Sequence, residues 1–475
     1  MSREYLTAGR AIDAVDRGVT FKAYCAKNRM GKVDFALAAE TLKYKSVLIN
    51  VLNAGGVSAQ SLDVGSQGLV EVMLYELLIG NGKIRGGGAV KRQLLAHIEE
   101  LRAALQAQLS AAGATTVAEL LPAHVRLAQL LPQYLRINPL QLHARGLSKL
   151  HIEEEIRQQC PGAQPDADIP HLFVLPLRSP SFGQHQRVQD GCLIIQDKAS
   201  CFPSQLLADA WIGGDVIDAC AAPGNKTSHV AACLQEKVGI GGPSPGTIYA
   251  FDKNPRRAEL LAQRMKVAGA TKVQVQNADF LELDVHDPRY ANVGAVLLDP
   301  SCSGSGVARD LNRHNDEGDT ADRLLKLRTF QLQALLKAFS FPAVQLVLYS
   351  TCSVHREENE DVVAEALASV AATGWMLDAP ARLSSWKRRG LAHPALTAQQ
   401  SHQLIRCAPE DGLNGFFVAQ FRRRISGHED VHSSKRSATD PELARHSERV
   451  NEPQRKRSRR LGDWRPLHAS HRLGF

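Results

Sequence analysis

The sequence predicts an α/β protein in which a doubly wound parallel sheet follows a helical region and a small α+β module. From about residue 205 the chain alternates short apolar strands with helices, the pattern of a parallel sheet with helical crossovers. Residues 1–125 instead show helical periodicity, and residues 126–204 show short segments interrupted by prolines. A chain of 475 residues is also too long for one ordinary core, so several domains are expected.

The first two regions carry no recognisable catalytic constellation. Apolar residues such as Leu69, Val72 and Met73 recur at helical spacing, and stripes of this kind usually pack in a core, so residues 1–125 are interpreted as scaffold or as a part that positions substrate. In residues 126–204 we expect strands at YLRINPL, HLFVLP and GCLIIQD. Arg136 and Asn138 are interpreted there as solvated surface, with contact to a polynucleotide as the alternative.

Residues 205–424 are predicted to contain the parallel sheet. Its strand candidates are DVIDAC, TIYAFD, KVQVQ, GAVLLD and VQLVLYS, and GFFVAQF at 415–421 closes the domain. The expected helices span 226–235, 255–268, 321–340 and 357–372. Ligands of such sheets bind outside the carboxyl ends of the strands, so the loops that follow the strands are the candidate site.

The positive charge of the chain is concentrated at its end. From Arg422 onward there are fourteen Lys and Arg against seven Asp and Glu, a difference of +7 in a formal net charge of +8. Residues 425–475 are polar and lack apolar periodicity, so we predict a disordered basic tail suited to contact with nucleic acid. RKRSRR at 455–460 suits nuclear import or nucleolar retention, and a solvated charged tail is an equal alternative.

Cysteine usage and hydropathy indicate an intracellular protein. The nine cysteines are odd in number, widely spaced and without a CxxC pair, which argues against disulfides and a zinc cluster, and no metal site is expected. No run of eighteen apolar residues occurs, and the amino terminus lacks the apolar core of a signal peptide. We therefore expect no membrane association.

The loop after the first strand of the sheet has the small residues of a nucleotide-binding turn. It comprises Cys220, Ala221, Ala222, Pro223, Gly224, Asn225 and Lys226. The spacings of a phosphate-binding P-loop and of a dinucleotide loop are both missing. Taken alone, the turn is equally well interpreted as a simple connection between a strand and a helix.

Acidic residues end the next two strands. Asp252 is placed to accept hydrogen bonds from a ribose, and Asp279 from the amine of an adenine. The alternative for Asp252 is helix capping, although Asn254 before Pro255 fits that role better. Arg257, one turn later, is either a ligand contact or a solvated helix residue.

Two cysteines follow the remaining strands. Cys352 ends LVLYSTC and is our candidate nucleophile, although a single cysteine is more often a buried apolar residue. Asp299 and Cys302 follow the neighbouring strand candidate. Two thiols that face one crevice are hard to explain by packing. The acidic run Glu357, Glu358, Glu360 and Asp361 is interpreted as the first turn of the next helix.

These motifs together resemble those of the NOP/Sun family of RNA (cytosine-5)-methyltransferases. The resemblance spans most of residues 130–423 and rests on QDKAS, DACAAPGNKT, LLDPSCSGSG and YSTCSVHREENEDVV. Asn225 stands where many relatives have glycine, and Ser301 where many have proline. The resemblance implies a Rossmann-like seven-stranded fold and S-adenosylmethionine as cofactor. It places Cys220 to Lys226, Asp252, Arg257, Asp279 and Asp299 around that cofactor.

The same resemblance implies a mechanism and a substrate. Cys352 would attack carbon 6 of a cytosine, Asp299 would donate a proton to the ring nitrogen, and Cys302 would act in product release. The amino-terminal region and DPSCSGSG look most like the eukaryotic branch that modifies large-subunit ribosomal RNA. We therefore expect a monomer that acts on ribosomal RNA or a pre-ribosomal particle in the nucleolus.

Four other functions are alternatives. A DNA cytosine-5-methyltransferase would use the cysteine of the proline-containing loop, which leaves Cys352 without a role. An adenine amino-methyltransferase would need an aromatic residue beside Pro300, where Ser301 and Cys302 stand instead. A ribosome-assembly factor without activity would not need both cysteines and Asp299. A transfer RNA (cytosine-5)-methyltransferase differs only in its substrate.

Overall fold

The computed structural model describes residues 2–19, 21–58, 60, 62, 64–177, 179–239, 245–308, 321–369 and 374–424. The chain divides into two compact units after residue 425, and the second unit lies outside the described residues. The tail that we predict at 425–475 therefore lies outside them too. The domain boundaries expected near residues 125 and 204 fall inside the first unit and stay predictions.

The amino-terminal region is helical and has a hydrophobic core of its own. Its core residues extend from Tyr5 to Ala104. Ser66 caps α5 by accepting a hydrogen bond from the Leu69 amide. The helices are α1 (Arg3–Asp16), α2 (Phe21–Lys27), α3 (Lys32–Lys43), α4 (Lys45–Ala54), α5 (Gln67–Leu78), α6 (Ala89–Ala96), α7 (Ile98–Ala112) and α8 (Ala123–Gln129), with the short 3-10 helix η1 (Val117–Leu120) before α8.

The following module is a four-stranded antiparallel sheet in the order β2-β3-β1-β4. Its strands are β1 (Gln133–Ile137), β2 (Gln164–Pro165), β3 (Leu172–Leu175) and β4 (Leu193–Ile195), and its helices are α9 (Pro139–Arg145), α10 (Lys149–Gln159) and α11 (Gln186–Gln189). The interpretation of Arg136 and Asn138 as surface residues is wrong, because both are buried. Arg136 Nη2 donates to Ser228 Oγ on α13 (3.1 Å), and Asn138 Nδ2 donates to the Ala268 carbonyl (2.8 Å), so both join the module to the next sheet.

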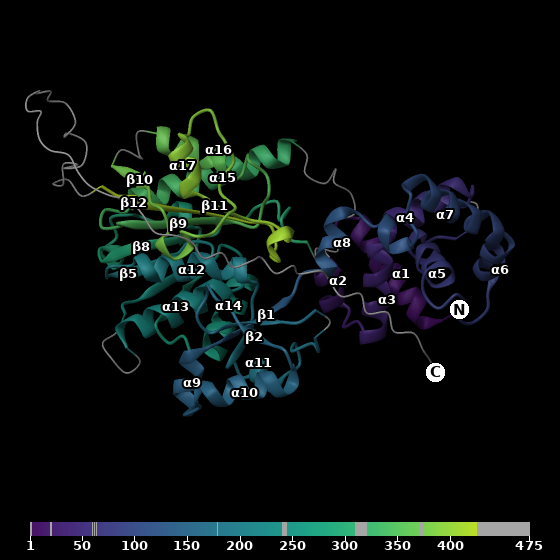
Figure 1. The fold of residues 1–475 in the computed structure, drawn as a ribbon, viewed down its shortest axis with the longest axis horizontal. Helices are drawn as coiled ribbons and strands as arrows, with labels where there is room; N and C mark the ends of the chain where they lie inside the picture. The colour runs from purple at the N-terminus through teal and green to yellow at the C-terminus, as the bar shows by residue number, and fades with distance from the viewer. Residues whose placement is uncertain are drawn as a thin grey trace, which may run out of the picture. The chain divides into compact units, whose positions relative to one another are not determined.

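An eight-stranded sheet dominates the rest of the unit (Figure 1). Its path is β10-β12-β9-β8-β5-β6-β7, and β11 pairs with β12 beside this path. Strands β5 to β9 run parallel, whereas β10, β11 and β12 pair antiparallel. The strands are β5 (Asp215–Asp218), β6 (Ile248–Phe251), β7 (Val273–Gln276), β8 (Val293–Leu298), β9 (Leu346–Thr351), β10 (Trp375–Leu377), β11 (Ile405–Cys407) and β12 (Phe416–Arg423).

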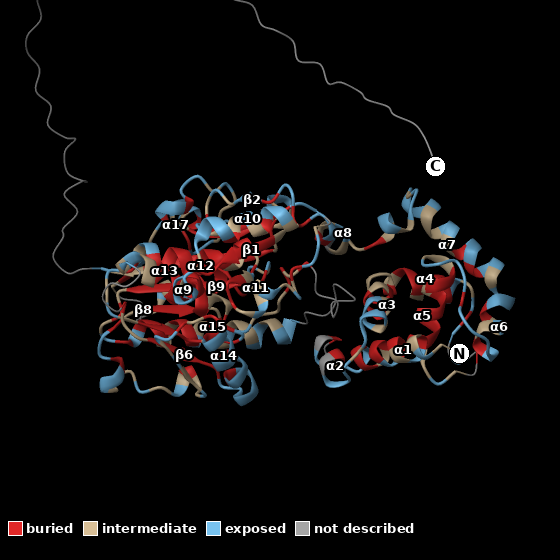
Figure 2. Ribbon diagram, turned by 90° about the horizontal axis from the view of Figure 1, so that it is seen from below, coloured by how far each residue is buried: buried red, intermediate tan, exposed pale blue. Residues whose placement is uncertain are grey.

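Helices cover both faces of this sheet, which confirms the doubly wound prediction. Residues of α12, α13 and α14 share one core with Val216 and Leu348, and residues of α15 and α16 share the other with Ile217 and Tyr349. Figure 2 shows the central strands as buried. The helices are α12 (Lys198–Ala210), α13 (Asn225–Val238), α14 (Pro255–Val267), α15 (Ala321–Ser340), α16 (Glu360–Ala368) and α17 (Ala398–Gln403), with 3-10 helices η2 (Phe280–Glu282), η3 (Pro288–Tyr290), η6 (Ala381–Leu383) and η7 (Pro409–Asp411).

Two features of this part of the chain, two short strands and the start of a helix, differ from the sequence prediction. We did not predict β10 and β11, because strands of three residues are too short for a periodic signal. The helix expected from residue 357 begins at Glu360. The segment from Val354 to Asn359 instead forms a turn that is held by side chains, and this turn follows Cys352 directly.

Candidate active site

The two cysteine loops meet because β8 and β9 are adjacent parallel strands. Cys302 follows β8 and Cys352 follows β9, so both side chains lie at the same end of the sheet. Their Sγ atoms are 3.1 Å apart, and both residues are free thiols with part of their surface exposed. The structure thus places a pair of interacting, accessible thiols where ligands of open α/β sheets bind.

The two thiols differ in their affinity for a proton. The hydrogen bond from Cys302 lowers the pKa of Cys352, and the charge of Lys226 acts in the same direction, against burial and the charge of Asp299. Donating that hydrogen bond, together with burial and nearby negative charges, raises the pKa of Cys302 well above that of an ordinary cysteine. Cys352 is therefore the member of the pair that more readily becomes a thiolate, and a thiolate is the nucleophilic form of cysteine.

A half-buried charge pair lies beside the thiols. Lys226 Nζ, at the start of α13, is 2.9 Å from Asp299 Oδ2, and Ser350 Oγ donates to Asp299 Oδ1 (2.6 Å). Burial lowers the pKa of Lys226, but the charge of Asp299 and the hydrogen bond to it outweigh this effect, so the net change is an increase. The ammonium also lies 5.2 Å from the centre of the Phe416 ring. Lys226 is thus held as a cation next to Cys352.

A cavity of 320 Å³ opens at the ends of β5, β6 and β8 and near β7. Of the residues that we predicted around a cofactor, six line it: Cys220, Ala222, Asp252, Arg257, Asp279 and Asp299. Burial raises the pKa of Cys220, so this residue is a neutral thiol. Asp299 lies in the cavity wall and also contacts Lys226, which connects the cavity with the cysteine pair.

Asp252 and Arg257 form one polar end of this cavity. Arg257 Nη2 is 3.2 Å from Asp252 Oδ2 and donates to the Ala222 carbonyl (2.7 Å). Asp252 is buried, and its Oδ1 accepts a hydrogen bond from the Asn254 amide (2.9 Å). Asn254 itself caps α14, as we expected from the Asn-Pro pair. Arg257 therefore fixes Asp252 and the cofactor loop and is more than a solvated helix residue.

Asp279 also lines the cavity. Its Oδ1 accepts from the Leu281 amide (3.0 Å), and its Oδ2 is 3.9 Å from Lys253 Nζ. Phe330 of α15 also lines the cavity, with Lys253 Nζ 5.5 Å from its ring centre. Phe330 is a flat apolar surface that we did not predict, because its place in α15 gives no local sign of a ligand contact.

Five residues of the predicted cofactor loop do not line this cavity, among them Lys226, which instead pairs with Asp299. Ala221 is buried and donates its amide to the Phe251 carbonyl, and Pro223 is exposed. Gly224 and Asn225 line a separate cavity of 480 Å³ between β4, α13 and α14. The loop turns away here because Gly224 has φ +103° and packs against α14, where an added Cβ would lie 2.7 Å from the Met265 side chain.

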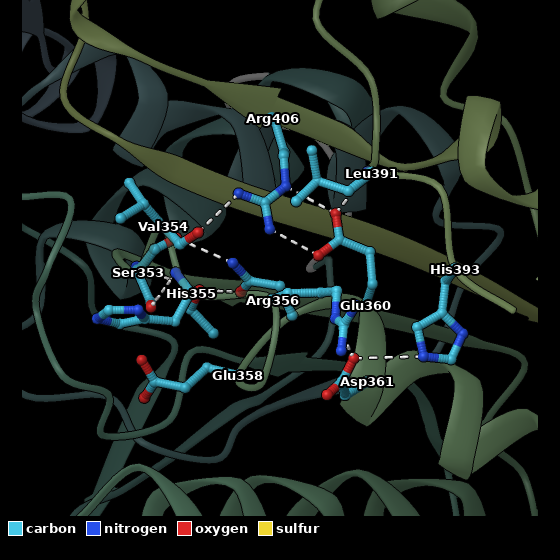
Figure 3. A network of polar contacts seen from close by, with 12 residues as sticks. Ser353, Val354, His355, Arg356, Glu358, Glu360, Asp361, Leu391, His393 and Arg406 are labelled. Carbon is cyan, nitrogen blue, oxygen red and sulfur yellow. Dashed lines mark hydrogen bonds and ion pairs between the residues drawn. The ribbon is translucent and has the colours of Figure 1, made fainter. Parts of the chain in front are cut away.

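The turn after Cys352 ties the two cysteine loops together. Ser353 Oγ is 3.2 Å from Ser303 Oγ and 3.1 Å from Ser305 Oγ, and the Gly306 amide donates to the Cys352 carbonyl (2.8 Å). Figure 3 shows the charged residues behind this turn, where Arg406 contacts both Glu360 and the Val354 carbonyl. The prediction that the acidic run forms the first turn of a helix is confirmed for Glu360 and Asp361 and is wrong for Glu357 and Glu358, which precede α16; Glu358 and Glu360 are buried.

In the described part of the chain no group of His, Cys, Asp or Glu side chains is arranged to hold a metal ion. No helix in that part is long and apolar enough to cross a membrane. The site comprises two thiols, the Lys226–Asp299 ion pair and a cavity lined by acidic residues, which is the equipment of a group-transfer enzyme with a thiol nucleophile.

Comparison with known proteins shows that this group-transfer enzyme is a methyltransferase. The family model described as 16S rRNA methyltransferase RsmB/F matches residues 209–422. A second model, the N-terminal domain of NOL1/NOP2/Sun domain family member 5, matches residues 32–121. A methyltransferase homologue from Pyrococcus horikoshii has a similar fold, with a TM-score of 0.50, 21% identity, and coverage of 78% of this chain and 98% of that chain.

Two relatives match most of the chain. A 28S rRNA (cytosine-C(5))-methyltransferase of Mus musculus is 36% identical over 406 residues, or 82% of this chain and 83% of the relative. The 25S rRNA (cytosine-C(5))-methyltransferase rcm1 of Schizosaccharomyces pombe is 34% identical over 413 residues, or 84% and 85%. The chain belongs to the RsmB/F and NOL1/NOP2/Sun family of RNA methyltransferases. This confirms the predicted family and fold and S-adenosylmethionine as the cofactor.

Proposed function

We propose that this protein methylates carbon 5 of a cytosine in large-subunit ribosomal RNA, with Cys352 as the nucleophile. The observation that carries the proposal is the contact between the Cys352 and Cys302 thiols, with Lys226 and Asp299 beside them. The mouse and Schizosaccharomyces pombe relatives described above are named as enzymes of large-subunit rRNA, which supports the choice of substrate.

The cavity fits the cofactor. Its volume of 320 Å³ lies at the lower end of the range for small-molecule sites. Asp252 offers acceptor oxygens to a ribose, Asp279 offers them to an amine, and Phe330 gives a flat apolar surface near Asp279. S-adenosylmethionine, when bound, supplies an electrophilic methyl group.

Carbon 5 of cytosine is a weak nucleophile, so the chain has to activate it. The Cys352 thiolate forms a bond to carbon 6, which pushes electron density to carbon 5 and to the ring nitrogen. That nitrogen needs a proton. Asp299 contacts Lys226 and accepts a hydrogen bond from Ser350, so it can donate a proton to the ring only after it has itself been protonated.

Product release needs a base and an intact Cys352 leaving group. After methylation a base takes the proton from carbon 5, the electron pair of that C–H bond forms the double bond to carbon 6, and the Cys352 thiolate departs; Cys302 can be this base once it has lost its own proton to solvent. Cys302 is the group placed to assist this step, because its Sγ is 3.1 Å from Cys352 Sγ. Without Cys302 the protein should stay bonded to its RNA.

The substrate has to present an unstacked base, which favours a single-stranded or locally opened RNA within a pre-ribosomal particle. Action on such a particle places the protein in the nucleolus.

The test measures methyl transfer from labelled S-adenosylmethionine to large-subunit rRNA, transfer RNA and DNA. It compares the wild type with Cys352→Ala, and Cys25→Ala is the control that removes a thiol of the amino-terminal core instead. We expect labelled 5-methylcytosine in large-subunit rRNA only. Label in transfer RNA alone, or in none of the three, would refute the proposal.

A further inference from the structure

Glu358 is a buried carboxylate behind the cysteine pair that the mechanism above does not use. It has no exposed surface, and its Oε1 accepts hydrogen bonds from the Ser303 amide and from Gln331 Nε2, both at 2.9 Å. Its Oε2 is buried and has no hydrogen-bond partner among the described residues. Burying a carboxylate without a basic partner costs free energy of folding, so we expect Glu358 to have a role that offsets this cost.

The contacts of Glu358 fix the loop that carries Cys302. The Ser303 amide, which binds the carboxylate, immediately follows Cys302. Gln331, the second donor, also donates to the Ser301 carbonyl (3.0 Å), so the residues on both sides of Cys302 are held. On the main-chain side, Tyr349 of β9 donates its hydroxyl to the Glu358 carbonyl (2.6 Å), which anchors the residue to the strand that leads to Cys352.

The charge of Glu358 differs from its acidic neighbours in having no basic partner. Arg406 binds Glu360 through two nitrogens at 2.7 and 2.6 Å, and Asp361 lies 2.9 Å from Arg356. Within the described residues no ion pair includes Glu358. In Figure 3 its carboxylate points away from Arg406. The negative charge of Glu358 is therefore not neutralised by a basic side chain and can change the pKa of nearby groups.

The surroundings are asymmetric in charge. Glu358 is among the negative groups that raise the pKa of Cys302, after the hydrogen bond to Cys352 and burial, whereas Lys226 lowers the pKa of Cys352. The anion near Cys302 and the cation near Cys352 both favour a proton on Cys302 and a negative charge on Cys352. The hydrogen bond between the thiols then has a fixed direction, from Cys302 to Cys352.

We propose that Glu358 is a positioning residue that holds the Cys302 loop and, through its charge, keeps the proton of the cysteine pair on Cys302. Cys352 is thereby left as the nucleophilic thiolate. The proposal rests on the proposed function, because it assigns a role within the same site. It adds that a buried carboxylate outside the cofactor cavity contributes to the choice between two adjacent thiols.

The test compares how fast each thiol reacts with iodoacetamide, because only the thiolate reacts. The full chain is labelled between pH 6 and 9, and the Cys302 and Cys352 peptides are quantified by mass spectrometry. Glu358→Gln keeps the size and the acceptor for Ser303 but removes the charge. We expect the ratio of Cys302 to Cys352 labelling to rise about tenfold, the equivalent of one pKa unit. Glu358→Asp, which keeps the charge, should stay closer to wild type.

Glu357→Gln is the matched control, because Glu357 is the exposed neighbour in the sequence and should leave the ratio unchanged. An unchanged ratio in Glu358→Gln would overturn the proposal. If that variant does not fold, the wild-type protein still decides, since equal labelling rates of its two thiols at pH 7 would also overturn the proposal. The labelling needs no RNA, so a failure here is distinguishable from a failure of the proposed function.

Discussion

The ion pair between Arg406 and Glu360 should be the polar contact behind the nucleophile that is most costly to break from one side. The side chain of Glu360 is 0% exposed and that of Arg406 10%, and Arg406 Nη1 also donates to the Val354 carbonyl, two residues after Cys352 (3.0 Å). Arg406→Met would leave a buried carboxylate with only the Leu391 amide as a partner. Removing one member of a buried pair costs about 3–5 kcal/mol, a large part of the roughly 5–15 kcal/mol that stabilises a typical protein.

The assay is the free energy of unfolding from urea titration, with Arg388→Met as the matched control. Arg388 also pairs with a carboxylate, Asp411, but its side chain is 39% exposed, so the loss should be about 0–1 kcal/mol. The double variant Glu360→Leu with Arg406→Met removes both charges and should recover most of the lost stability. We also expect Arg406→Met to slow Cys352 alkylation, because the turn after Cys352 loses its anchor.

A loss in Arg406→Met no larger than that in Arg388→Met would refute the reasoning. So would a double variant that is less stable than Arg406→Met, because the penalty would then not come from the unpaired carboxylate.

Three further predictions concern charge. Lys226 lowers the pKa of Cys352, so Lys226→Met should shift the rise of Cys352 alkylation to higher pH, and an unshifted profile would contradict this. Burial raises the pKa of Asp218 to about 7, so between about pH 4 and pH 7 the folded state keeps a proton on Asp218 that the unfolded state has lost. The free energy of unfolding should therefore fall by about 4 kcal/mol as the pH rises through this range. Asp218→Asn should lack this pH-dependent loss when urea unfolding is compared at pH 5 and pH 8. Deleting residues 425–475, which carry much of the positive charge, should weaken RNA binding more at low salt than at high salt, and unchanged affinity in a filter-binding titration would exclude the tail from binding.

Local patterns predicted the position of the site because parallel strands place their following loops at one edge. Asp299, Cys302 and Cys352 are near one another only through the adjacency of β8 and β9, which the structure adds. Asp252 and Asp279 were found in the same way, each by its place after a strand.

Residues that depend on tertiary burial were not predictable from local patterns. Arg136 reads as a surface residue, but its guanidinium is buried between the small sheet and α13. Glu358 and Glu360 look like a solvated helix start, but partners more than 25 residues away in the sequence, Gln331 and Arg406, hold them inside. Phe416, next to Lys226, comes from the last strand and gives no local signal of a role.

The most direct measurement of the central claim is the covalent intermediate of Cys302→Ala. The variant is incubated with large-subunit rRNA and S-adenosylmethionine, separated under denaturing conditions, and the RNA-linked peptide is sequenced by mass spectrometry. We predict an accumulated protein–RNA adduct through Cys352 and no adduct when Cys352→Ala is added to the same chain. An adduct through any other residue, or methylated cytosine formed by the Cys352→Ala protein, would contradict Cys352 as the nucleophile.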